Sequence, residues 1–247
     1  MSKAALIVGF ALVFLVLGRL LPFAKVSGFD RVIKNFSLAA LNAILSPLIV
    51  IPVSVLAARW ALDWRPEWWG GWAGLALDLL LLDVWIYWWH RANHVVPMLW
   101  RFHEVHHLDE TLDASSALRF HFGEVLLSSL VRAGVIFLLD VPLASIVVFE
   151  TCISLAAIFH HSNVRLPPAF ERALSRVIIT PSIHWVHHHA KRADTDSNYA
   201  TVLSLWDRLF GSSSKTARTA EMPVGVEGKC DEGLIALIVR PFHRIGE

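Results

Sequence analysis

Charged side chains are scarce in this sequence of 247 residues. Lys, Arg, Asp and Glu together make up 17% of the chain, which is below the share of about a quarter that is usual in soluble domains. Hydrophobic residues account for 55%. The formal net charge is only +1 and no basic stripe is present, which argues against nucleic acid as a partner. The composition indicates an integral membrane protein.

Cysteine is scarce as well, and fingerprints of nucleotide cofactors are missing. Cys152 lies in an apolar run and Cys230 lies near the end of the chain, so the two form neither a disulfide framework nor a CxxC zinc site. We expect both to be free thiols. We find no flavin or nicotinamide fingerprint and no segment that resembles cytochrome b5.

The apolar residues are grouped into runs that are long enough to cross a bilayer. Residues 4–17 begin a run of roughly 20 residues with no A-x-A cleavage signal, which predicts an uncleaved anchor. A second span is expected at residues 38–56, although Pro47 and Pro52 interrupt it, and a third at residues 72–89. Residues 122–159 are mostly apolar around a central Asp-Val-Pro turn and predict a re-entrant or spanning hairpin. The expected fold is all-α, with about four to five transmembrane or re-entrant helices.

Two ionisable residues lie inside the predicted hairpin. Arg132 precedes Val141 by nine residues and Glu150 follows it by nine, so at helical rise both lie about 13 Å from the turn. Ionisable groups at such depth usually pair with one another. We predict that Arg132 and Glu150 face each other across the hairpin.

Basic residues predict the orientation of the spans. The loop between the first two spans contains Arg19, Lys25, Arg31 and Lys34, which places it in the cytoplasm by the positive-inside rule. The third span then returns to the cytoplasm, and the hairpin enters the membrane from that side and comes back to it. All histidine clusters are therefore expected in a helical cap at the cytoplasmic face.

Histidine occurs 13 times, and most of the copies are grouped in short clusters. The clusters have the spacing of one helix face, at i, i+4 or at i, i+3, i+4. They are His90 and His94; His103, His106 and His107; and His184, His187 and His188. Imidazole binds iron, copper, nickel and zinc. Because the His-x-x-His-His pattern occurs twice, the sequence predicts more than one metal ion.

Other interpretations of these residues remain open at this point. The segment from His103 to His107 satisfies HExxH, the zinc metalloprotease motif in which Glu104 would be the general base. A protease would leave the other histidine clusters unexplained. A ferritin-like carboxylate site would need a second Glu-x-x-His, which is missing. A histidine-rich metal transporter would place its ligands near the bilayer midplane, whereas most histidines here follow the spans.

Six segments together resemble the fatty acid hydroxylase and sterol desaturase family of integral-membrane di-iron enzymes. They are DVWIYWWHRANH, LWRFHEVHH, ALRFHFGE, FHHSNV, TPSIHWVHHH and NYATVLSLWDRLFGS, and they cover about residues 83–211. The resemblance implies that ten histidines bind metal: His90, His94, His103, His106, His107, His121, His161, His184, His187 and His188. Eight of them, without His121 and His161, lie in the clusters expected to form the catalytic core.

The resemblance also implies the chemistry. Two iron ions with O2 as co-substrate would hydroxylate or desaturate an unactivated C–H bond of a fatty acyl, sterol or related lipid taken from the bilayer. Electrons would come from a separate donor, such as a cytochrome b5-like protein, a ferredoxin or a reductase. We expect a single membrane-embedded domain over residues 1–247, with N-terminal helices at 1–82, a catalytic region at 83–211 and a tail at 212–247. The apolar stretch 234–239 in the tail is expected to be an interfacial helix.

Several residues depart from the family pattern or add to it. His160 and His189 are additional histidines, which we expect to support a ligand or to face solvent. Ala200 stands where the family often has glycine, which questions the backbone conformation there. Asp83 and Asp207 are candidates for the acceptors that fix the tautomer of a ligand histidine, with helix capping as the alternative for Asp207.

Overall fold

The helices of a computed structural model account for the expected elements. It describes residues 2–26 and 28–243, which are helical apart from loops and three isolated β-bridges. The α-helices are α1 (Lys3–Leu20), α2 (Phe29–Leu45), α3 (Val50–Arg59), α4 (Gly71–Val95), α5 (Pro97–His107), α6 (Phe122–Leu139), α7 (Leu143–His161), α8 (Pro168–Leu174), α9 (Pro181–His187), α10 (Arg192–Thr195), α11 (Leu205–Leu209) and α12 (Leu234–Val239). The described residues also form two 3-10 turns, η1 (Ser116–Leu118) and η2 (Arg240–Phe242).

The candidate membrane spans confirm the predicted fold class. Within the described residues, α1, α4, α6 and α7 are each long and apolar enough to cross a bilayer. The pair α2 and α3 makes a fifth candidate, broken between residues 45 and 50 and bent by 44°. The break includes Pro47, which cannot donate a backbone hydrogen bond.

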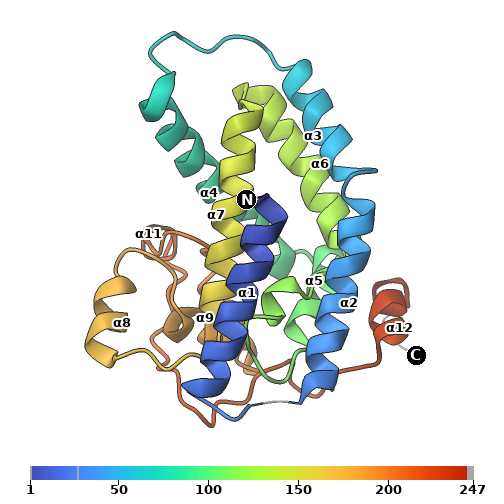
Figure 1. Cartoon of the computed structure of the whole chain (residues 1–247), viewed down its shortest axis with the longest axis vertical. Coiled ribbons are helices and arrows are strands. Elements are labelled where there is room, and N and C mark those ends of the chain that lie inside the picture. The colour runs from blue at the N-terminus through green and yellow to red at the C-terminus, as the bar shows by residue number, and fades with distance from the viewer. Residues whose placement is uncertain (1, 27, 244–247) are drawn as a thin grey trace.

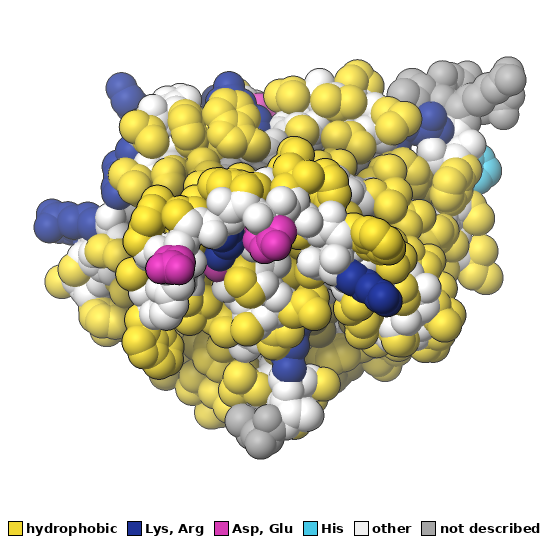
Figure 2. All heavy atoms as spheres, turned by 90° about the horizontal axis from the view of Figure 1, so that it is seen from above, with side chains coloured by type: hydrophobic (Ala, Val, Ile, Leu, Met, Phe, Trp, Pro, Cys, Tyr) yellow, Lys and Arg dark blue, Asp and Glu magenta, His cyan; other side chains and the backbone are white. Residues whose placement is uncertain are grey.

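The short helices that follow α7, among them the histidine-bearing α9, lie at one end of the spans (Figure 1). In Figure 1 the α6–α7 turn is at the top, whereas α8, α9 and α12 lie in the lower part of the view. Figure 2 looks down on the upper end, where hydrophobic side chains cover most of the face and only scattered charged groups interrupt them. The polar chemistry of the chain is therefore concentrated at the lower end.

A proline-induced elbow brings α4 and α5 together. Val96 has an extended conformation, because a residue before proline disfavours the helical region, and Pro97 then occupies the first position of α5. The elbow turns the chain back at once, so the last turns of α4 lie beside α5. The histidines of these two helices consequently face a common space.

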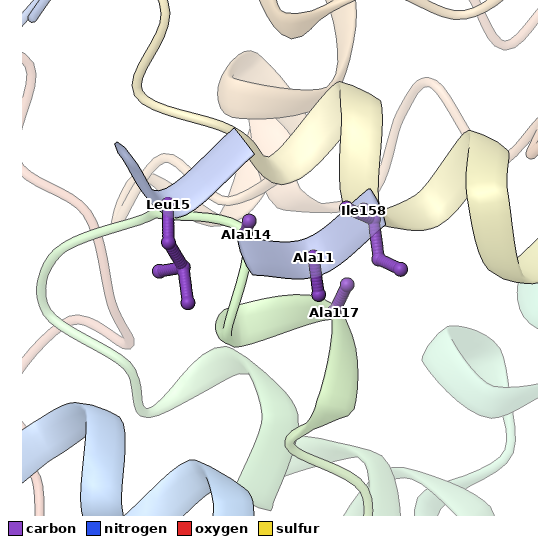
Figure 3. Packing of buried hydrophobic residues seen from close by; sticks show 5 residues of the cluster. All are labelled: Ala11, Leu15, Ala114, Ala117 and Ile158. Carbon is purple, nitrogen blue, oxygen red and sulfur yellow. The ribbon is translucent and has the colours of Figure 1, made fainter. Parts of the chain in front are cut away.

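The loop around η1 is held by small side chains. Ala114 and Ala117 pack against Ala11 and Leu15 of α1 and against Ile158 of α7, and all five side chains are buried (Figure 3). Alanine has no bulk beyond Cβ, so the loop approaches both helices closely. This contact fixes the segment between α5 and α6 next to the histidine-bearing end of α7.

The segment expected as the loop between the first two spans contains the first turns of α2, which begins at Phe29. Its basic residues are paired within the protein. Arg31 donates to Asp109 at 2.6 Å and pairs with Asp113, while Lys34 lies 2.6 Å from Asp231. The fully buried Arg119 also pairs with Asp231 and donates to the carbonyl of Val105 at 2.7 Å. This network ties α2, the η1 loop and the tail together.

The hairpin has the predicted form. Asp140 ends α6 in the left-handed conformation (φ 50°), and Pro142 precedes α7. Arg132 Nη2 lies 2.9 Å from Glu150 Oε1, which confirms the predicted pair. Lys3 of α1 also pairs with Glu150, a contact that the sequence did not indicate.

Candidate metal centre

Nine histidines converge in two groups that could each hold a metal ion. The first group contains His90, His94, His103, His107 and His187, and the second contains His106, His161, His184 and His188. Within each group the candidate ligand atoms all lie within 4.8 Å of one another. The side chains come from α4, α5, α7 and α9, with His188 at the C-cap of α9.

Backbone carbonyls orient several of these imidazoles. In four histidines Nδ1 lies within hydrogen-bond distance of a backbone carbonyl oxygen. The pairs are His90 with Tyr199 (2.7 Å), His187 with Ser197 (2.6 Å), His161 with Ala157 (2.7 Å) and His106 with Arg119 (3.2 Å). A carbonyl only accepts, so each Nδ1 carries the proton and each Nε2 keeps its lone pair. This arrangement is typical of histidines that bind a metal through Nε2.

A carboxylate orients His103. Glu124 Oε1 accepts from His103 Nδ1 at 2.8 Å and from Asn93 Nδ2 at 3.3 Å. Glu124 is a positioning residue that our sequence reasoning did not single out. The available signal was its place in the ALRFHFGE segment, three residues after His121.

The unprotonated ring nitrogens of the grouped histidines show whether a cation fits between them. His106 Nε2 and His161 Nε2 are 3.1 Å apart, although both rings carry their proton on Nδ1. Two acceptors at this distance repel each other unless a cation or a proton lies between them. Both ring nitrogens of the buried His94, His107 and His188 have no hydrogen-bond partner. Buried polar atoms without partners are rare, so these residues fit metal ions well.

The charge state of the rings favours ligation. Burial, followed by the charge of neighbouring imidazoles, holds the pKa of His106, His107, His184, His187 and His188 well below the ordinary value. A histidine must be neutral to bind a metal. These rings are therefore already in the state that ligation requires at neutral pH.

Comparison with known proteins identifies the family. The family model described as fatty acid hydroxylase matches residues 75–212, which include all nine grouped histidines. The chain belongs to the fatty acid hydroxylase family. No solved structure matches the chain.

The curated proteins to which the chain is similar include several lipid-modifying enzymes. The ornithine lipid hydroxylase OlsE of Rhizobium tropici is 28% identical over 200 residues, which are 81% of this chain and 60% of that protein. An alkylglycerol monooxygenase of Danio rerio is 32% identical over 175 residues, or 69% of this chain and 36% of that protein. The cholesterol 25-hydroxylase of Rattus norvegicus is 24% identical over 242 residues, or 91% of this chain and 79% of that protein. The chain thus spans less than two thirds of the length of the first two relatives.

His121 differs from the expectation that the family resemblance gave. Its Nδ1 accepts from the backbone N–H of Gly123 at 2.9 Å, and its Nε2 donates to the carbonyl of Ile238 at 2.9 Å. Both ring nitrogens are engaged in capping α6 and holding the tail. The structure therefore leaves His121 outside both histidine groups.

The two additional histidines occupy different environments. His160 is buried, and its ring centroid lies 3.9 Å from that of His184, so it does not face solvent. His189 Nδ1 lies 2.8 Å from Asp194 Oδ2 and is outside both groups. That His160 supports a ligand histidine stays a prediction, whereas His189 belongs to the loop that follows α9.

The two aspartates have different roles from those expected. Asp83 does not reach a histidine but accepts from Trp206 Nε1 at 2.7 Å and from the backbone N–H of Leu203 at 3.1 Å. Asp83 therefore differs from the expectation, because Trp206 and Leu203 engage its carboxylate instead of a histidine. Asp207 accepts from the backbone N–H groups of Tyr199 and Ala200, at 2.7 and 3.1 Å. It thereby positions the Tyr199 carbonyl that binds His90.

Ala200, which stands where the family often has glycine, does not have a positive φ. The positive φ falls two residues earlier, at Asn198 (φ 52°), and asparagine tolerates this conformation better than most residues. The alanine is therefore compatible with the loop.

Glu104 does not have the geometry of a protease base. Its carboxylate pairs with Lys229 and accepts from Arg240 Nε at 2.7 Å, so it is held by the tail. These two partners keep the pKa of Glu104 below its ordinary value although burial acts in the opposite direction. The zinc metalloprotease alternative consequently lacks its general base.

A cavity of about 480 Å³ extends from the histidines into the membrane-spanning part. Six histidines line it at one end: His90, His103, His106, His160, His161 and His184. Apolar side chains such as Ile86, Val125 and Ile153 line its walls. Lys3, Arg132 and Glu150 also line it.

The contacts of Glu124 and Glu104 predict different effects on metal binding. We expect Glu124→Ala to lower metal affinity by about 10-fold to 100-fold, because His103 loses the acceptor that orients its ring. Glu104→Gln is the control and should retain the metal. Metal content after dialysis against graded chelator measures both. Loss of metal in Glu104→Gln but not in Glu124→Ala would contradict this assignment.

Proposed function

We propose that this protein is a membrane-bound di-iron oxygenase that hydroxylates or desaturates a C–H bond of a lipid. The observation that carries the proposal is the pair of all-histidine groups, which share one cavity with apolar walls. Membership of the fatty acid hydroxylase family supports the reaction class. Residues 83–211 form the proposed catalytic region, preceded by spans in 1–82 and followed by the tail 212–247.

The nine grouped histidines are the proposed ligands, five for one ion and four for the other. Imidazole suits iron, and neutral ligands leave the charge of the ion uncompensated, so the site stays strongly electrophilic. Two iron ions bound there would supply the reduction of O2 and the oxidation of the C–H bond. His121 is not included, because both of its ring nitrogens are engaged elsewhere.

The chain contributes orientation and the exclusion of water. Eight of the nine ligand side chains are buried, and His90 faces the cavity. Glu124 and the backbone carbonyls keep the imidazoles fixed, so little reorganisation accompanies the reaction. Apolar walls hold an alkyl chain or a sterol body against the histidines.

The names of the relatives support a lipid substrate without choosing one. They refer to ornithine lipid, alkylglycerol and cholesterol, which have different polar parts and different apolar bodies. We propose a lipid taken from the bilayer. Electrons come from a separate donor, because the sequence has no flavin or nicotinamide fingerprint.

We propose that the histidine-bearing end faces the cytoplasm. Arg31 and Lys34 are offset by acidic partners, so they contribute less to this inference than the sequence alone indicated. Lys25, Arg165 and Lys191 are exposed at the same end of the molecule. Basic residues near the ends of spans favour the cytoplasmic side.

The ligand assignment predicts a loss of function that is specific to one histidine. His187→Ala should bind less iron and form product at least about 100-fold more slowly. Removing a metal ligand costs more activity than removing a residue that only orients a ligand, which typically costs about 10-fold to 100-fold. His189→Ala, two residues away and outside both groups, should retain iron and activity. Iron is measured by elemental analysis, and lipid products by mass spectrometry as a gained oxygen atom or two lost hydrogens. One zinc ion per chain that survives His187→Ala but not His103→Ala would overturn the proposal.

The proposed orientation is tested with the exposed Cys230 in the tail. In a Cys152→Ser background, a membrane-impermeant maleimide should label Cys230 in inverted vesicles and not in intact cells. Removing Cys152, which lies in the candidate span α7, leaves one thiol to follow. Labelling in intact cells would place the histidine-bearing end on the outer side.

A further inference from the structure

Three charged side chains line the cavity away from the metal groups. Arg132 of α6 lies 2.9 Å from one carboxylate oxygen of Glu150, and Lys3 of α1 pairs with the other oxygen. All three line the same cavity as the histidines. Glu150 and His161 are both on α7, eleven residues apart, so this charged triad lies about 16 Å along the helix axis from the metal groups.

The charged triad has one positive charge in excess. Its two cations face a single carboxylate whose oxygens are both already paired. The buried Arg132 Nε has no hydrogen-bond partner. The other carboxylate that lines the cavity is Glu124, which is engaged by His103 and Asn93. Among the described residues that line the cavity, no carboxylate other than Glu150 lies beside Lys3 or Arg132, because Glu124 is eight residues, or about 12 Å, from Arg132 along α6.

An excess charge at this depth is unfavourable unless a partner arrives. Arg132 and Glu150 lie inside candidate membrane spans, where ionisable residues are rare and usually mark a functional site. The neighbouring lining residues Ser128, Ser129 and Ser154 are neutral. A ligand group with acceptor oxygens and a negative charge would satisfy both the free Nε donor and the charge.

We propose that Lys3 and Arg132, which Glu150 holds in place, bind the anionic group, a carboxylate or a phosphate, of an elongated lipid whose apolar end reaches the histidines. This inference rests on the proposed function and specifies its substrate class. Between the two ends, the cavity is lined by apolar groups such as Ile86, Ile153 and Ala157. The oxidised carbon therefore lies about 16 Å from the anionic group, remote from it along the chain.

Binding without turnover tests the inference. The probe is tritiated hexadecanoate, bound to detergent-purified protein without reductant, with hexadecyl phosphate and hexadecan-1-ol as competitors. We expect either anion to compete at least about tenfold better than the alcohol, since hydrogen bonds to charged groups are the stronger ones. The stronger of the two anions identifies the source of the charge as a carboxylate or a phosphate.

Matched variants locate the binding site. Arg132→Gln should weaken hexadecanoate binding by roughly tenfold or more and leave hexadecan-1-ol unaffected. Arg65→Gln is the control, because Arg65 is equally buried (side chain 11% exposed, as for Arg132) and pairs with Asp78 outside this cavity. Lys3→Gln keeps the Arg132–Glu150 pair and provides a second variant if Arg132→Gln unfolds, which thermal melting detects.

The outcomes separate this inference from the proposed function. Hexadecanoate binding that depends on Arg132 and survives in His187→Ala supports the inference even if the protein proves to hold no iron. Equal competition by the alcohol, or unchanged hexadecanoate affinity in both Arg132→Gln and Lys3→Gln, would overturn it while leaving the metal assignment intact.

Discussion

The mutual repulsion of buried imidazole lone pairs is the constraint on which the rest of the structure depends. His106 and His161 direct unprotonated Nε2 atoms at each other across 3.1 Å, and His184 Nε2 lies 3.0 Å from that of His161. Burial disfavours protonation as a remedy, because it lowers the pKa of His106 and His184. Metal ions bound there would resolve the repulsion and engage the buried nitrogens that have no other partner. The nine side chains are therefore best understood as two incomplete coordination spheres.

The surrounding structure holds these side chains in place at several levels. Carbonyls of Tyr199, Ser197 and Ala157 fix individual rings, and Asp207 in turn fixes the backbone at Tyr199. The elbow at Pro97 sets α4 against α5. On a larger scale, the ion pairs of α2 with the η1 loop and the tail enclose the site. Such layered support keeps ligand geometry precise in a chain whose spans expose much of their surface to lipid.

The helical spacing of the sequence was sufficient to predict the spans, the hairpin pair and the clustering of histidines, because each depends on local periodicity. The spacing could not predict how the histidines of each His-x-x-His-His motif are divided between the two metal groups. His103 and His107 belong to one group and His106 to the other, while His187 is separated from His184 and His188. The division arises where α5 and α9 meet, which is a tertiary contact that spacing does not encode.

The contacts that differ from the sequence-based expectations have the same physical origin. His121 matches the family pattern but is engaged by Gly123 and Ile238, and Asp83 meets Trp206, more than 100 residues later in the chain. Glu124 was overlooked because a glutamate at the start of an apolar helix is common. Each of these roles is decided by a partner that is distant in the sequence or by competition for one ring nitrogen.

Anomalous diffraction at the iron edge, from crystals of anaerobically purified protein, tests the central claim most directly. Two iron peaks are predicted, one among His90, His94, His103, His107 and His187 and the other among His106, His161, His184 and His188. A single peak, or peaks that appear only at the zinc edge, would contradict the assignment of a di-iron centre.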